Sequence, residues 1–479
     1  MKNPKRSNPL PQAGEGKAIV DTIVAPATAL GRAGVGVIRV SGPLVVYIAK
    51  KISGKLPKPR YAAYTEFKDH HDKVIDKGLV LFFPGPNSFT GEDVLELQVH
   101  GSPVVIDILI QQILSLGARL ARPGEFSERA FLNHKMDLVQ AEAAADLINA
   151  GSEQAARAAM QSLEGVFSEK IADINHQLIH LRVYIEAAMD FAEEEIDFLG
   201  DNSIVEKLEN IIQNLQDIQH QAKQGALLQE GMVVVIAGKP NAGKSSLLNQ
   251  LSGRDSAIVT HIPGTTRDIL RERIYLDGLP LEIIDTAGLR ASDDLIEQEG
   301  IKRAREMITK ADCVLYIRDI TDEDNINPES EYTELLNHPK LLLVYNKIDL
   351  KPLTRPSDTP ATSVGQALSR KGRGENIFVI KLSAKTGEGI DVLKKHLKSY
   401  MGFEEKAETG FSARRRHLDA LRRADEFLIH AKDQLLNFKA LECAAEDLRL
   451  VQQALNEITG EFTNDDLLGR IFSSFCIGK

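Results

Sequence analysis

The feature that most constrains this chain is a glycine-rich segment that lies between a strand-like run and a helix-like run. Gly238-Lys-Pro-Asn-Ala-Gly-Lys-Ser245 follows the apolar run Met232–Ala237 and precedes Ser246-Leu-Leu-Asn-Gln-Leu251. In a strand–loop–helix context, glycines and the free N–H groups at the helix start wrap phosphate oxygens. We therefore predict a phosphate-binding loop in which Lys244 reaches the β- and γ-phosphates and Ser245 holds Mg²⁺.

Four more motifs follow in the order that a guanine-nucleotide site requires. Thr265-Thr-Arg-Asp268 supplies Thr266 as a second Mg²⁺ ligand, and Asp285-Thr-Ala-Gly288 supplies a carboxylate near the metal and an N–H for the γ-phosphate. In Asn346-Lys-Ile-Asp349, the carboxylate can accept two hydrogen bonds that guanine offers and adenine does not. The predicted GTP site, completed by Ser383-Ala-Lys385, comprises Asn241, Ala242, Gly243, Lys244, Ser245, Ser246, Thr260, His261, Ile262, Pro263, Gly264, Thr265, Thr266, Asp285, Thr286, Ala287, Gly288, Asn346, Lys347, Ile348, Asp349, Ser383, Ala384 and Lys385.

One position departs from the Ras-like pattern. Leu289 stands where a Ras-like GTPase has the glutamine that orients the attacking water, so another group must position that water. Asn241 and the segment Thr260–Thr266 are candidates to surround a monovalent cation, although Asn241 also fits a simple turn. Glu297 is a candidate for holding the water, although these residues alone fit a solvated helix glutamate better.

Composition limits the class of protein. A length of 479 residues corresponds to about three domains. The net charge of −10 does not favour unaided capture of a polyanion, so binding of nucleic acid would need a local patch or a partner. The apolar runs are too short to span a bilayer, and Cys313, Cys443 and Cys476 form no CxxC pair. We expect a cytoplasmic protein without a disulfide framework.

Changes in residue pattern along the chain predict its organisation. Short β-branched runs precede residue 120, and helical spacing of apolar residues continues to about residue 228. From Gly231, strand-length apolar runs alternate with helices, and helical spacing returns after Tyr400. We predict a multidomain α/β and α protein: a disordered extension (1–18), an N-terminal α+β domain (19–135), a discontinuous helical domain (136–230 and 401–479) and an inserted Ras-like P-loop GTPase domain with a doubly wound sheet (231–400).

The chain closely resembles the MnmE family, also called TrmE, of tRNA-modification GTPases. The resemblance covers about Ile19 to Lys479 and includes the GTPase motifs already described. The other motifs that carry it are Asp21-Thr-Ile-Val-Ala25, Gly34-Val-Gly-Val-Ile-Arg-Val-Ser-Gly42, Gly91-Glu-Asp-Val-Leu-Glu-Leu97, Arg122-Pro-Gly-Glu-Phe-Ser-Glu-Arg-Ala-Phe131 and Cys476-Ile-Gly-Lys479.

The resemblance implies a specific reaction. A K⁺-activated GTP hydrolase, working as a homodimer and with the FAD-dependent partner MnmG in a heterotetramer, adds a (carboxymethyl)aminomethyl group to C5 of the wobble uridine of certain tRNAs. The one-carbon unit comes from a tetrahydrofolate derivative, 5-formyl or 5,10-methylene, bound to the N-terminal domain, and GTP hydrolysis drives conformational change. The implied site residues are Asn241, Thr260, Ile262 and Thr265 for K⁺, Ser245 and Thr266 for Mg²⁺, Glu297 for the water, Arg39, Glu96, Lys135 and Lys479 for the folate, and Cys476 for tRNA modification.

Two features leave alternatives open. Arg414-Arg-Arg-His417, with Arg422 and Arg423, is a candidate tRNA patch that fits a solvated helix face equally well. The polar loop Lys351–Asn376 is enlarged relative to the family pattern. The rival function is a switch GTPase that assists ribosome assembly, and the N-terminal domain and Cys476 favour tRNA modification over it.

Overall fold

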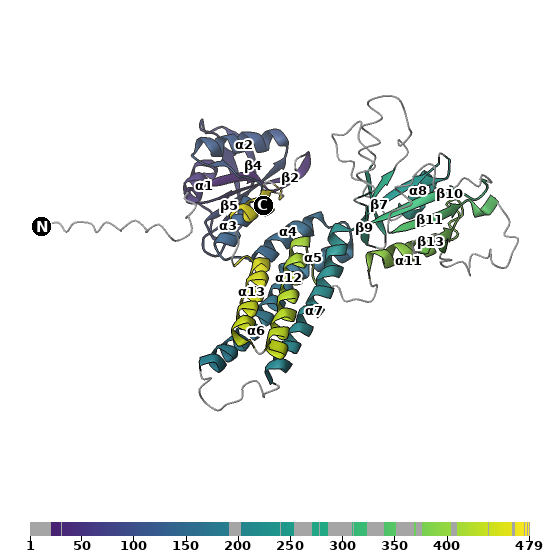
Figure 1. Cartoon of the computed structure of the whole chain (residues 1–479). Helices are drawn as coiled ribbons and strands as arrows, with labels where there is room; N and C mark the ends of the chain where they lie inside the picture. The colour runs from purple at the N-terminus through teal and green to yellow at the C-terminus, as the bar shows by residue number, and fades with distance from the viewer. Residues whose placement is uncertain are drawn as a thin grey trace, which may run out of the picture. The chain divides into compact units, whose positions relative to one another are not determined.

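The computed structural model describes residues 21–29, 31–190, 203–239, 241–252, 271–276, 278–285, 309, 311–322, 340–350, 368–369, 376–403, 410–438, 440–461, 465–473, 475–476 and 478, and all structural statements below concern these residues. The chain divides into two compact units (Figure 1). The first contains Met1–Ala145 and Gly460–Lys479, and the second contains Asp146–Thr459. Each unit is described by itself.

The first unit is built on a six-stranded sheet with the order β3-β4-β5-β2-β1-β6. Neighbouring strands are antiparallel, except that β1 and β6 are parallel. The register pairs Arg39 of β2 directly with Glu96 of β5. The strands are β1 (Ile23–Pro26), β2 (Ala33–Ser41), β3 (Ala63–Lys68), β4 (Val74–Phe83), β5 (Val94–Gly101) and β6 (Arg119–Leu120).

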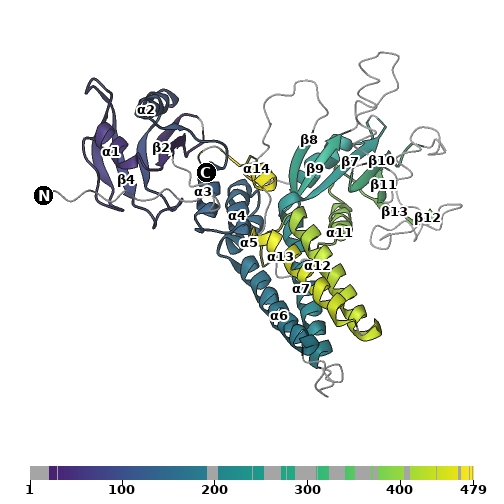
Figure 2. The same cartoon turned by 60° about the vertical axis from the view of Figure 1, so that its left-hand side comes forward.

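Alternating residues of these strands face two different helical layers. Val24 belongs to the core that contains α1 (Val45–Ser53) and α2 (Pro103–Ser115). The residues on either side of it, Ile23 and Ala25, pack with Phe126 of α3 (Glu125–Leu132). This follows from the period of two in a strand, which turns successive side chains to opposite faces. The sheet therefore lies between α1 and α2 on one face and α3 on the other (Figure 2).

Segments from the two ends of the sequence share the first unit. Helix α14 (Asp465–Ser473) packs against α3, and Phe472 and Phe475 are buried in a cluster with Leu138 of α4 (Leu138–Asn149). Burial of a phenylalanine side chain contributes about 2 kcal/mol. Two aromatic anchors therefore hold the C-terminal segment on the N-terminal fold.

The second unit begins with a helical bundle formed by two separated stretches of sequence. Helices α5 (Glu153–Leu163), α6 (Val166–Asp190) and α7 (Ser203–Glu230) pack with α12 (Arg415–Asp433) and α13 (Leu441–Thr459). Helix α12 lies against α7 and α13, and α13 lies against α6 (Figure 1). Ser152 caps α5 by accepting a hydrogen bond from the Ala155 N–H at 3.2 Å. The discontinuous helical domain of the predicted fold class is confirmed, and its bounds 136–230 and 401–479 stay predictions.

A seven-stranded sheet occupies the sequence between the two helical stretches. Its order is β12-β13-β11-β10-β7-β9-β8. The strand-length apolar runs predicted after Gly231 are confirmed as the parallel strands β7, β9, β10, β11 and β13, whereas the edge strands β8 and β12 run antiparallel to their neighbours. The elements are β7 (Met232–Gly238), α8 (Lys244–Ser252), β8 (Arg271–Leu276), β9 (Leu279–Asp285), β10 (Cys313–Asp319), β11 (Leu341–Asn346), β12 (Leu368–Ser369), β13 (Asn376–Lys381) and α11 (Ile390–Met401).

The hairpin formed by β8 and β9 joins this sheet to the bundle. Ala155 and Leu228 of the bundle share a buried core with Ile274 and Leu281 of the hairpin. A Cβ added to Gly151 would lie 1.7 Å from the Tyr275 hydroxyl oxygen, so this approach requires a residue without a side chain. Among the described helices, none is both long enough and apolar enough to cross a membrane.

Candidate functional site

The phosphate-binding loop connects the end of β7 to the start of α8. Asn241 has a φ of 63° and Gly243 a φ of 95°, so the loop contains two left-handed residues in three positions. The Lys244 ammonium donates hydrogen bonds to the carbonyl oxygens of Gly238 (3.0 Å) and Lys239 (3.2 Å). Ser245 and Ser246 are exposed in the first turn of α8. The lysine ammonium and a helix N-terminus are therefore brought together, as a phosphate site requires.

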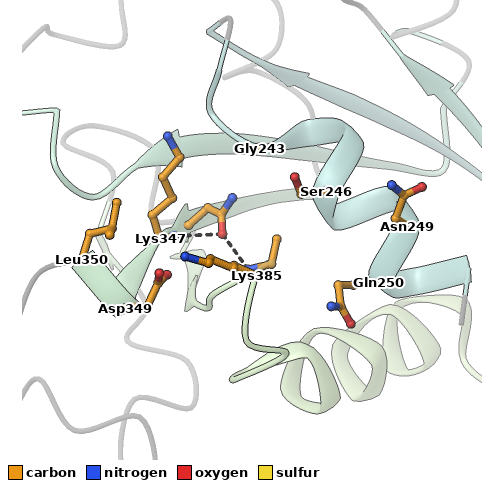
Figure 3. Close-up of a pocket in the computed structure, with 10 residues that line it drawn as sticks. Gly243, Ser246, Asn249, Gln250, Lys347, Asp349, Leu350 and Lys385 are labelled. Atoms are coloured by element: carbon orange, nitrogen blue, oxygen red, sulfur yellow. Dashed lines mark hydrogen bonds between the residues drawn. The ribbon is translucent and has the colours of Figure 1, made fainter.

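A cavity of about 640 Å³ opens beside this loop (Figure 3). Gly243, Ser246, Asn249 and Gln250 line one side, and the motif that contains Asp349 lines the other together with Lys385. The Asp349 carboxylate accepts a hydrogen bond from the Ser383 hydroxyl at 2.6 Å, which fixes its orientation. The donor set and the volume fit a nucleotide whose base meets a carboxylate and whose phosphates reach the loop.

Buried Asn346 connects the two sides of this cavity. Its side-chain amide donates to the Ala242 carbonyl oxygen at 2.8 Å, and its Oδ1 accepts from the N–H groups of Lys347 and Ala384, each at 2.8 Å. Lys347 is held in turn by an ion pair with Asp319 at 2.6 Å. The base-recognition motif, the Ser383–Lys385 motif and the phosphate-binding loop are thereby joined by side-chain hydrogen bonds.

The structure brings together part of the predicted GTP site. Pairing of Ile236 with Asp285 in β7 and β9 places the start of Asp285-Thr-Ala-Gly288 at the same sheet edge as the phosphate-binding loop. Seven predicted residues line the cavity, namely Gly243, Ser246, Asn346, Lys347, Asp349, Ala384 and Lys385. Ala242 and Ser383 are hydrogen-bonded to residues of this lining. The predicted residues Thr260, His261, Ile262, Pro263, Gly264, Thr265, Thr266, Thr286, Ala287, Gly288, Glu297 and Lys479 lie outside the described residues, as do Leu289 and most of the loop Lys351–Asn376.

A second group of predicted residues meets in the first unit. Arg39 forms a two-point contact with Glu96, with Nε and Nη2 at 2.9 and 2.8 Å from Oε1. Its guanidinium also lies 5.2 Å from the ring centre of Phe89 and donates to the Gly478 carbonyl oxygen at 3.5 Å. Lys135 is exposed, and its Cε lies 3.3 Å from a Cβ built on Gly91. Arg39 and Glu96 are therefore adjacent charged groups beside the C-terminal tail.

Two glycine positions hold the tail that carries Cys476. The Gly124 N–H donates to the Cys476 carbonyl oxygen at 3.3 Å, and a Cβ on Gly124 would lie 2.5 Å from the Phe472 carbonyl oxygen. Gly478 is buried with a φ of 95°, and a Cβ there would lie 2.0 Å from the Pro26 carbonyl oxygen. Cys476 itself is exposed. The backbone is thus fixed on both sides of an accessible thiol.

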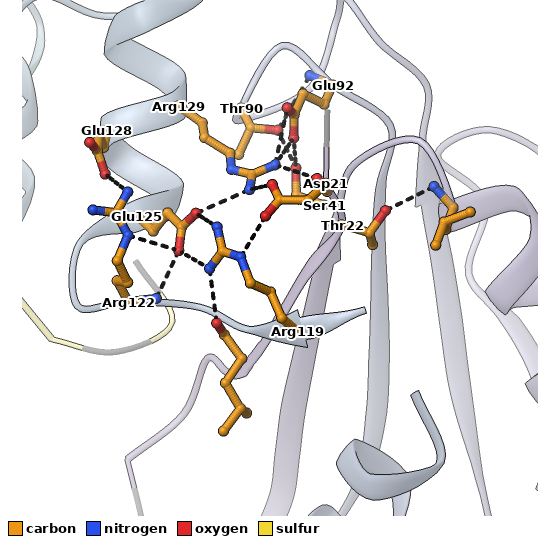
Figure 4. Close-up of polar contacts among 12 residues, drawn as sticks. Asp21, Thr22, Ser41, Thr90, Glu92, Arg119, Arg122, Glu125, Glu128 and Arg129 are labelled. Atoms are coloured by element: carbon orange, nitrogen blue, oxygen red, sulfur yellow. Dashed lines mark hydrogen bonds and ion pairs between the residues drawn. The ribbon is translucent and has the colours of Figure 1, made fainter. Parts of the chain in front are cut away.

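A buried ionic network supports the segment that contains Gly124 (Figure 4). Arg129 is 0% exposed and donates to carboxylates of Asp21 (2.7 Å), Glu92 (3.0 and 3.2 Å) and Glu125 (3.1 Å). Glu125 also accepts from the Arg119 guanidinium and from the Arg122 N–H. Burial raises the pKa of Glu125, but these hydrogen bonds outweigh burial and hold the pKa below its usual range.

The arginines of the candidate tRNA patch on α12 are engaged within the second unit. Arg415 pairs with Glu230, Arg422 with Asp419 and Glu426, and Arg423 with Asp419 and Glu457. Arg414 pairs with Asp146 at 2.5 Å, and Arg416 donates to the carbonyl oxygens of residues 457 and 458. This pattern corresponds to the alternative interpretation, a charge-balanced helix face.

Comparison with known proteins assigns the family. A family model described as "MnmE helical domain" matches residues 138–476, and one described as "GTP-binding protein TrmE N-terminus" matches residues 22–135. The chain belongs to the MnmE family. A tRNA modification GTPase MnmE of Pseudomonas aeruginosa strain UCBPP-PA14 is 56% identical over 97% of this chain and 100% of its own length. The MnmE protein of Vibrio cholerae serotype O1 is 56% identical over 96% of this chain and 99% of its own length.

Membership of the MnmE family confirms the predicted fold class and makes the chain a GTP hydrolase with an α+β N-terminal domain and a helical domain. Among solved structures, the G domain of the T. maritima FeoB iron transporter is 28% identical over 35% of this chain and 98% of its own length, with a TM-score of 0.24. The assignment rests on the two family models and the curated MnmE relatives.

Sequence reasoning missed the role of several residues that surround these sites. Phe89, Arg119, Glu125 and Arg129 carried no assigned function, although Glu125 and Arg129 lie in a motif that the MnmE family shares. The presence of two arginines and two glutamates within the ten residues of that motif was the available signal. It could not show that the charges pair with one another in the protein interior.

Proposed function

We propose that this chain is the GTPase subunit of a tRNA wobble-uridine modification system. With an FAD-dependent MnmG partner it adds a (carboxymethyl)aminomethyl group to C5 of uridine 34, using a one-carbon unit from a tetrahydrofolate derivative, and it acts as a homodimer within a heterotetramer in the cytoplasm. The supporting observation is that one chain carries a nucleotide cavity and, in its other unit, an accessible thiol on a tail whose Gly478 carbonyl oxygen accepts from the ion-paired Arg39. The proposal keeps the segments 19–135, 136–230, 231–400 and 401–479 as its domains.

In the proposed GTPase cycle, Asp349 selects guanine and Lys244 compensates the charge of the β- and γ-phosphates. The start of α8 fits Mg²⁺ in its chemistry, because Ser245 presents a hydroxyl oxygen there. The backbone pairing of Ile236 with Asp285 brings the start of the motif Asp285-Thr-Ala-Gly288 to the same end of the sheet. Thr266 is the proposed second ligand, and Glu297 the group that holds the water. Mg²⁺ and K⁺ supply positive charge that stabilises the charge developing on the phosphates.

Asn241, Thr260, Ile262 and Thr265 are the proposed K⁺ ligands. Asn241 lies in the phosphate-binding loop, and its side chain and backbone carbonyl are oxygen donors of the kind that a monovalent cation binds. Turnover of GTP should be about a hundredfold faster in K⁺ than in Na⁺ at equal ionic strength, since one preorganised charge-stabilising contact is worth about 10²- to 10³-fold in rate. Equal rates would remove the cation from the proposal.

For the modification step, Arg39, Glu96, Lys135 and Lys479 are the proposed folate contacts, and Cys476 is the residue proposed to take part in tRNA modification. Guanidinium and ammonium groups suit the carboxylates of a folate, and a carboxylate such as Glu96 suits the donors of a pterin. The position of Arg39 between Glu96 and the Gly478 carbonyl oxygen supports this assignment. The bound folate supplies a one-carbon unit.

The decisive experiment measures wobble nucleosides in tRNA from a deletion strain by mass spectrometry. The C5-substituted uridines should disappear and return with the wild-type chain but not with Cys476→Ser. Purified Cys476→Ser should hydrolyse GTP normally, because the thiol and the nucleotide cavity belong to different units. An unchanged nucleoside profile in the deletion strain would refute the proposal and favour the rival role in ribosome assembly.

A further inference from the structure

A long stretch of the first unit contains cations and no carboxylates. From Thr22 to Thr65 the sequence has Arg32, Arg39, Lys50, Lys51, Lys55, Lys58 and Arg60 but neither aspartate nor glutamate. The whole chain has 68 carboxylates and a net charge of −10, so this local excess of seven positive charges is opposite in sign to the protein as a whole. A local basic patch is the arrangement that an acidic protein needs to hold a polyanion.

Five of these cations lie within eleven consecutive residues, at the end of α1 and in the connection that follows it. Lys50 and Lys51 form the last turn of α1, and Lys55, Lys58 and Arg60 lie in the connection from α1 to β3. All five are exposed, and in the described part of the chain none pairs with a carboxylate. The next acidic residue along the chain, Glu66, forms ion pairs with Lys77 (2.9 Å) and Lys68 (3.8 Å). We call these five residues the α1–β3 surface.

Exposed tyrosines accompany these cations. Tyr47, Tyr61 and Tyr64 are 48%, 63% and 72% exposed. The Lys51 ammonium lies 5.8 Å from the ring centre of Tyr47. Cations interleaved with exposed aromatic rings are typical of RNA-binding surfaces, where lysines contact phosphates and rings stack on unpaired bases. A helix C-terminus explains two lysines on its own but not the tyrosines or the three later cations.

The connection that carries the surface is held in one conformation. Pro57 is buried and Pro59 bridges to Phe82, while the Arg60 N–H donates to the Phe82 carbonyl oxygen at 2.8 Å. The Tyr61 N–H donates to the Lys58 carbonyl oxygen at 3.1 Å. Two prolines and these hydrogen bonds reduce the conformational entropy that the segment would lose on binding.

We propose that the α1–β3 surface binds the phosphate backbone of the tRNA substrate, with Tyr61 and Tyr64 stacking on unpaired bases. This inference rests on the tRNA-modifying function and adds the surface that holds the tRNA. It differs from the α12 arginines in one physical respect: Arg415, Arg422 and Arg423 each form an ion pair with a carboxylate. In the α1–β3 surface, Arg60 donates to the Asn87 carbonyl oxygen, and among the described residues no carboxylate pairs with any of the five cations. The α1–β3 cations retain their full charge for a ligand.

The test measures binding of labelled bulk tRNA to the full chain as a function of KCl concentration. Lys50→Gln/Lys55→Gln/Lys58→Gln should raise Kd at least about tenfold and reduce the slope of log K against log salt by about 2, because each phosphate contact contributes about 0.7 to 0.9. Tyr61→Ala/Tyr64→Ala should raise Kd about tenfold with an unchanged slope. The matched control is Arg415→Gln/Arg422→Gln/Arg449→Gln, which removes the same charge from exposed, paired positions and should leave Kd within about twofold.

Three results would overturn this inference. The first is a wild-type affinity and salt slope in the lysine variant, and the second is an absence of measurable tRNA binding by the wild-type chain at low salt. The third is a variant that keeps its tRNA affinity but no longer binds phosphatidylserine vesicles, which would identify a membrane surface instead. Nucleoside analysis of the deletion strain is a separate measurement, so failure of the tRNA surface is distinguishable from failure of the proposed function.

Discussion

The Asn346 side chain donates a hydrogen bond to the Ala242 carbonyl oxygen at 2.8 Å, although 104 residues separate them in the sequence. A Cβ added to the adjacent Gly243 would lie 2.1 Å from the same amide nitrogen, so the two motifs approach as closely as their backbones permit. The phosphate-binding loop and the base-recognition motif are therefore positioned relative to each other by the protein before a nucleotide binds.

Asn346→Ala should destabilise the sheet that carries the nucleotide cavity. The substitution leaves the Ala242 carbonyl and the N–H groups of Lys347 and Ala384 without this partner, at a cost of about 3 kcal/mol. In calorimetry, the unfolding transition of this sheet is the one whose midpoint temperature rises when GTP is added. That midpoint should be lower in the variant than in the wild type. Asn249→Ala, at an exposed position lining the same cavity, is the control and should change stability by less than about 0.5 kcal/mol. Equal transition temperatures for the two variants would contradict the role of Asn346.

Asp349→Asn should change base selectivity. The Ser383 hydroxyl orients one carboxylate oxygen, and an amide in its place would present a donor to the donors of guanine. The affinity for GTP should fall about 10- to 100-fold, and that for xanthosine triphosphate should rise, as measured by competition with a fluorescent nucleotide. Asp391→Asn, at an exposed position in the first turn of α11, serves as the control. Unchanged selectivity would show that the base binds elsewhere.

Gly478→Ala should lower tRNA modification and leave GTP hydrolysis nearly unchanged. A side chain at this position meets the Pro26 carbonyl oxygen and must displace the tail that carries Cys476. A misplacement of about 1 Å is enough to lower a reaction rate about a hundredfold. Modified nucleosides should decrease accordingly while GTP turnover stays within about twofold of wild type.

The control for Gly478 is Gly402→Ala. Gly402 also has a positive φ, of 69°, but a Cβ there meets nothing within 4 Å. It therefore reports the cost of left-handed backbone strain without a collision, about 1 kcal/mol. If both variants modify tRNA equally well, close seating of the tail is not required.

Glu125→Gln should lower the free energy of unfolding of the first unit and make that free energy depend less on pH in the acid range. An unfolded glutamate has a pKa of about 4.3, and the folded-state pKa of Glu125 lies below its usual range. The ionised carboxylate therefore contributes stability above about pH 4.3, and this contribution is lost as the pH falls through the folded-state pKa. At pH 7 the variant should be less stable by about 3 kcal/mol, because Arg129 keeps a buried charge without this partner.

Thermal unfolding between pH 3 and 7 checks this expectation. Glu128→Gln is the matched control, because its carboxylate lies on the same helix, is partly exposed and, among the described residues, forms an ion pair with Arg122 alone. If the unfolding temperature of Glu125→Gln falls with decreasing pH as steeply as that of the wild type, other carboxylates determine how stability depends on pH.

The sequence was sufficient to predict the central strands because they are buried on both faces. Runs such as Met232–Ala237 and Cys313–Ile317 contain apolar residues throughout and appear as strands of the sheet. The edge strand β8 was missed because Arg271-Glu-Arg273 gives its start the composition of a loop. One face of β8 meets solvent, since Ile274 and Leu276 are buried and Arg273 between them and the strand start is exposed, so the sequence lacks the continuous apolar run of a central strand.

The contacts within the sites were less predictable than the motifs. Arg39 and Glu96 were predicted separately as ligand contacts, and only the register of β2 with β5 shows that they contact each other. Arg129 illustrates the same limit, because an arginine is almost never fully buried unless it is paired. Its partners Asp21 and Glu92 lie 108 and 37 residues away, and no local pattern identifies such pairs.

The packing of Gly478 against the end of β1 also affects the order in which the protein folds during translation. Arg39 and Gly478, which meet in the first unit, are 439 residues apart, and a ribosome needs between about 20 and 90 seconds to translate that distance. During this interval the cluster of Leu138 and Phe131 lacks Phe472 and Phe475, so the nascent chain exposes an apolar surface. The nucleotide-binding sheet is translated within the interval. GTP binding is therefore expected to become possible on the ribosome before the unit that carries Cys476 has finished folding.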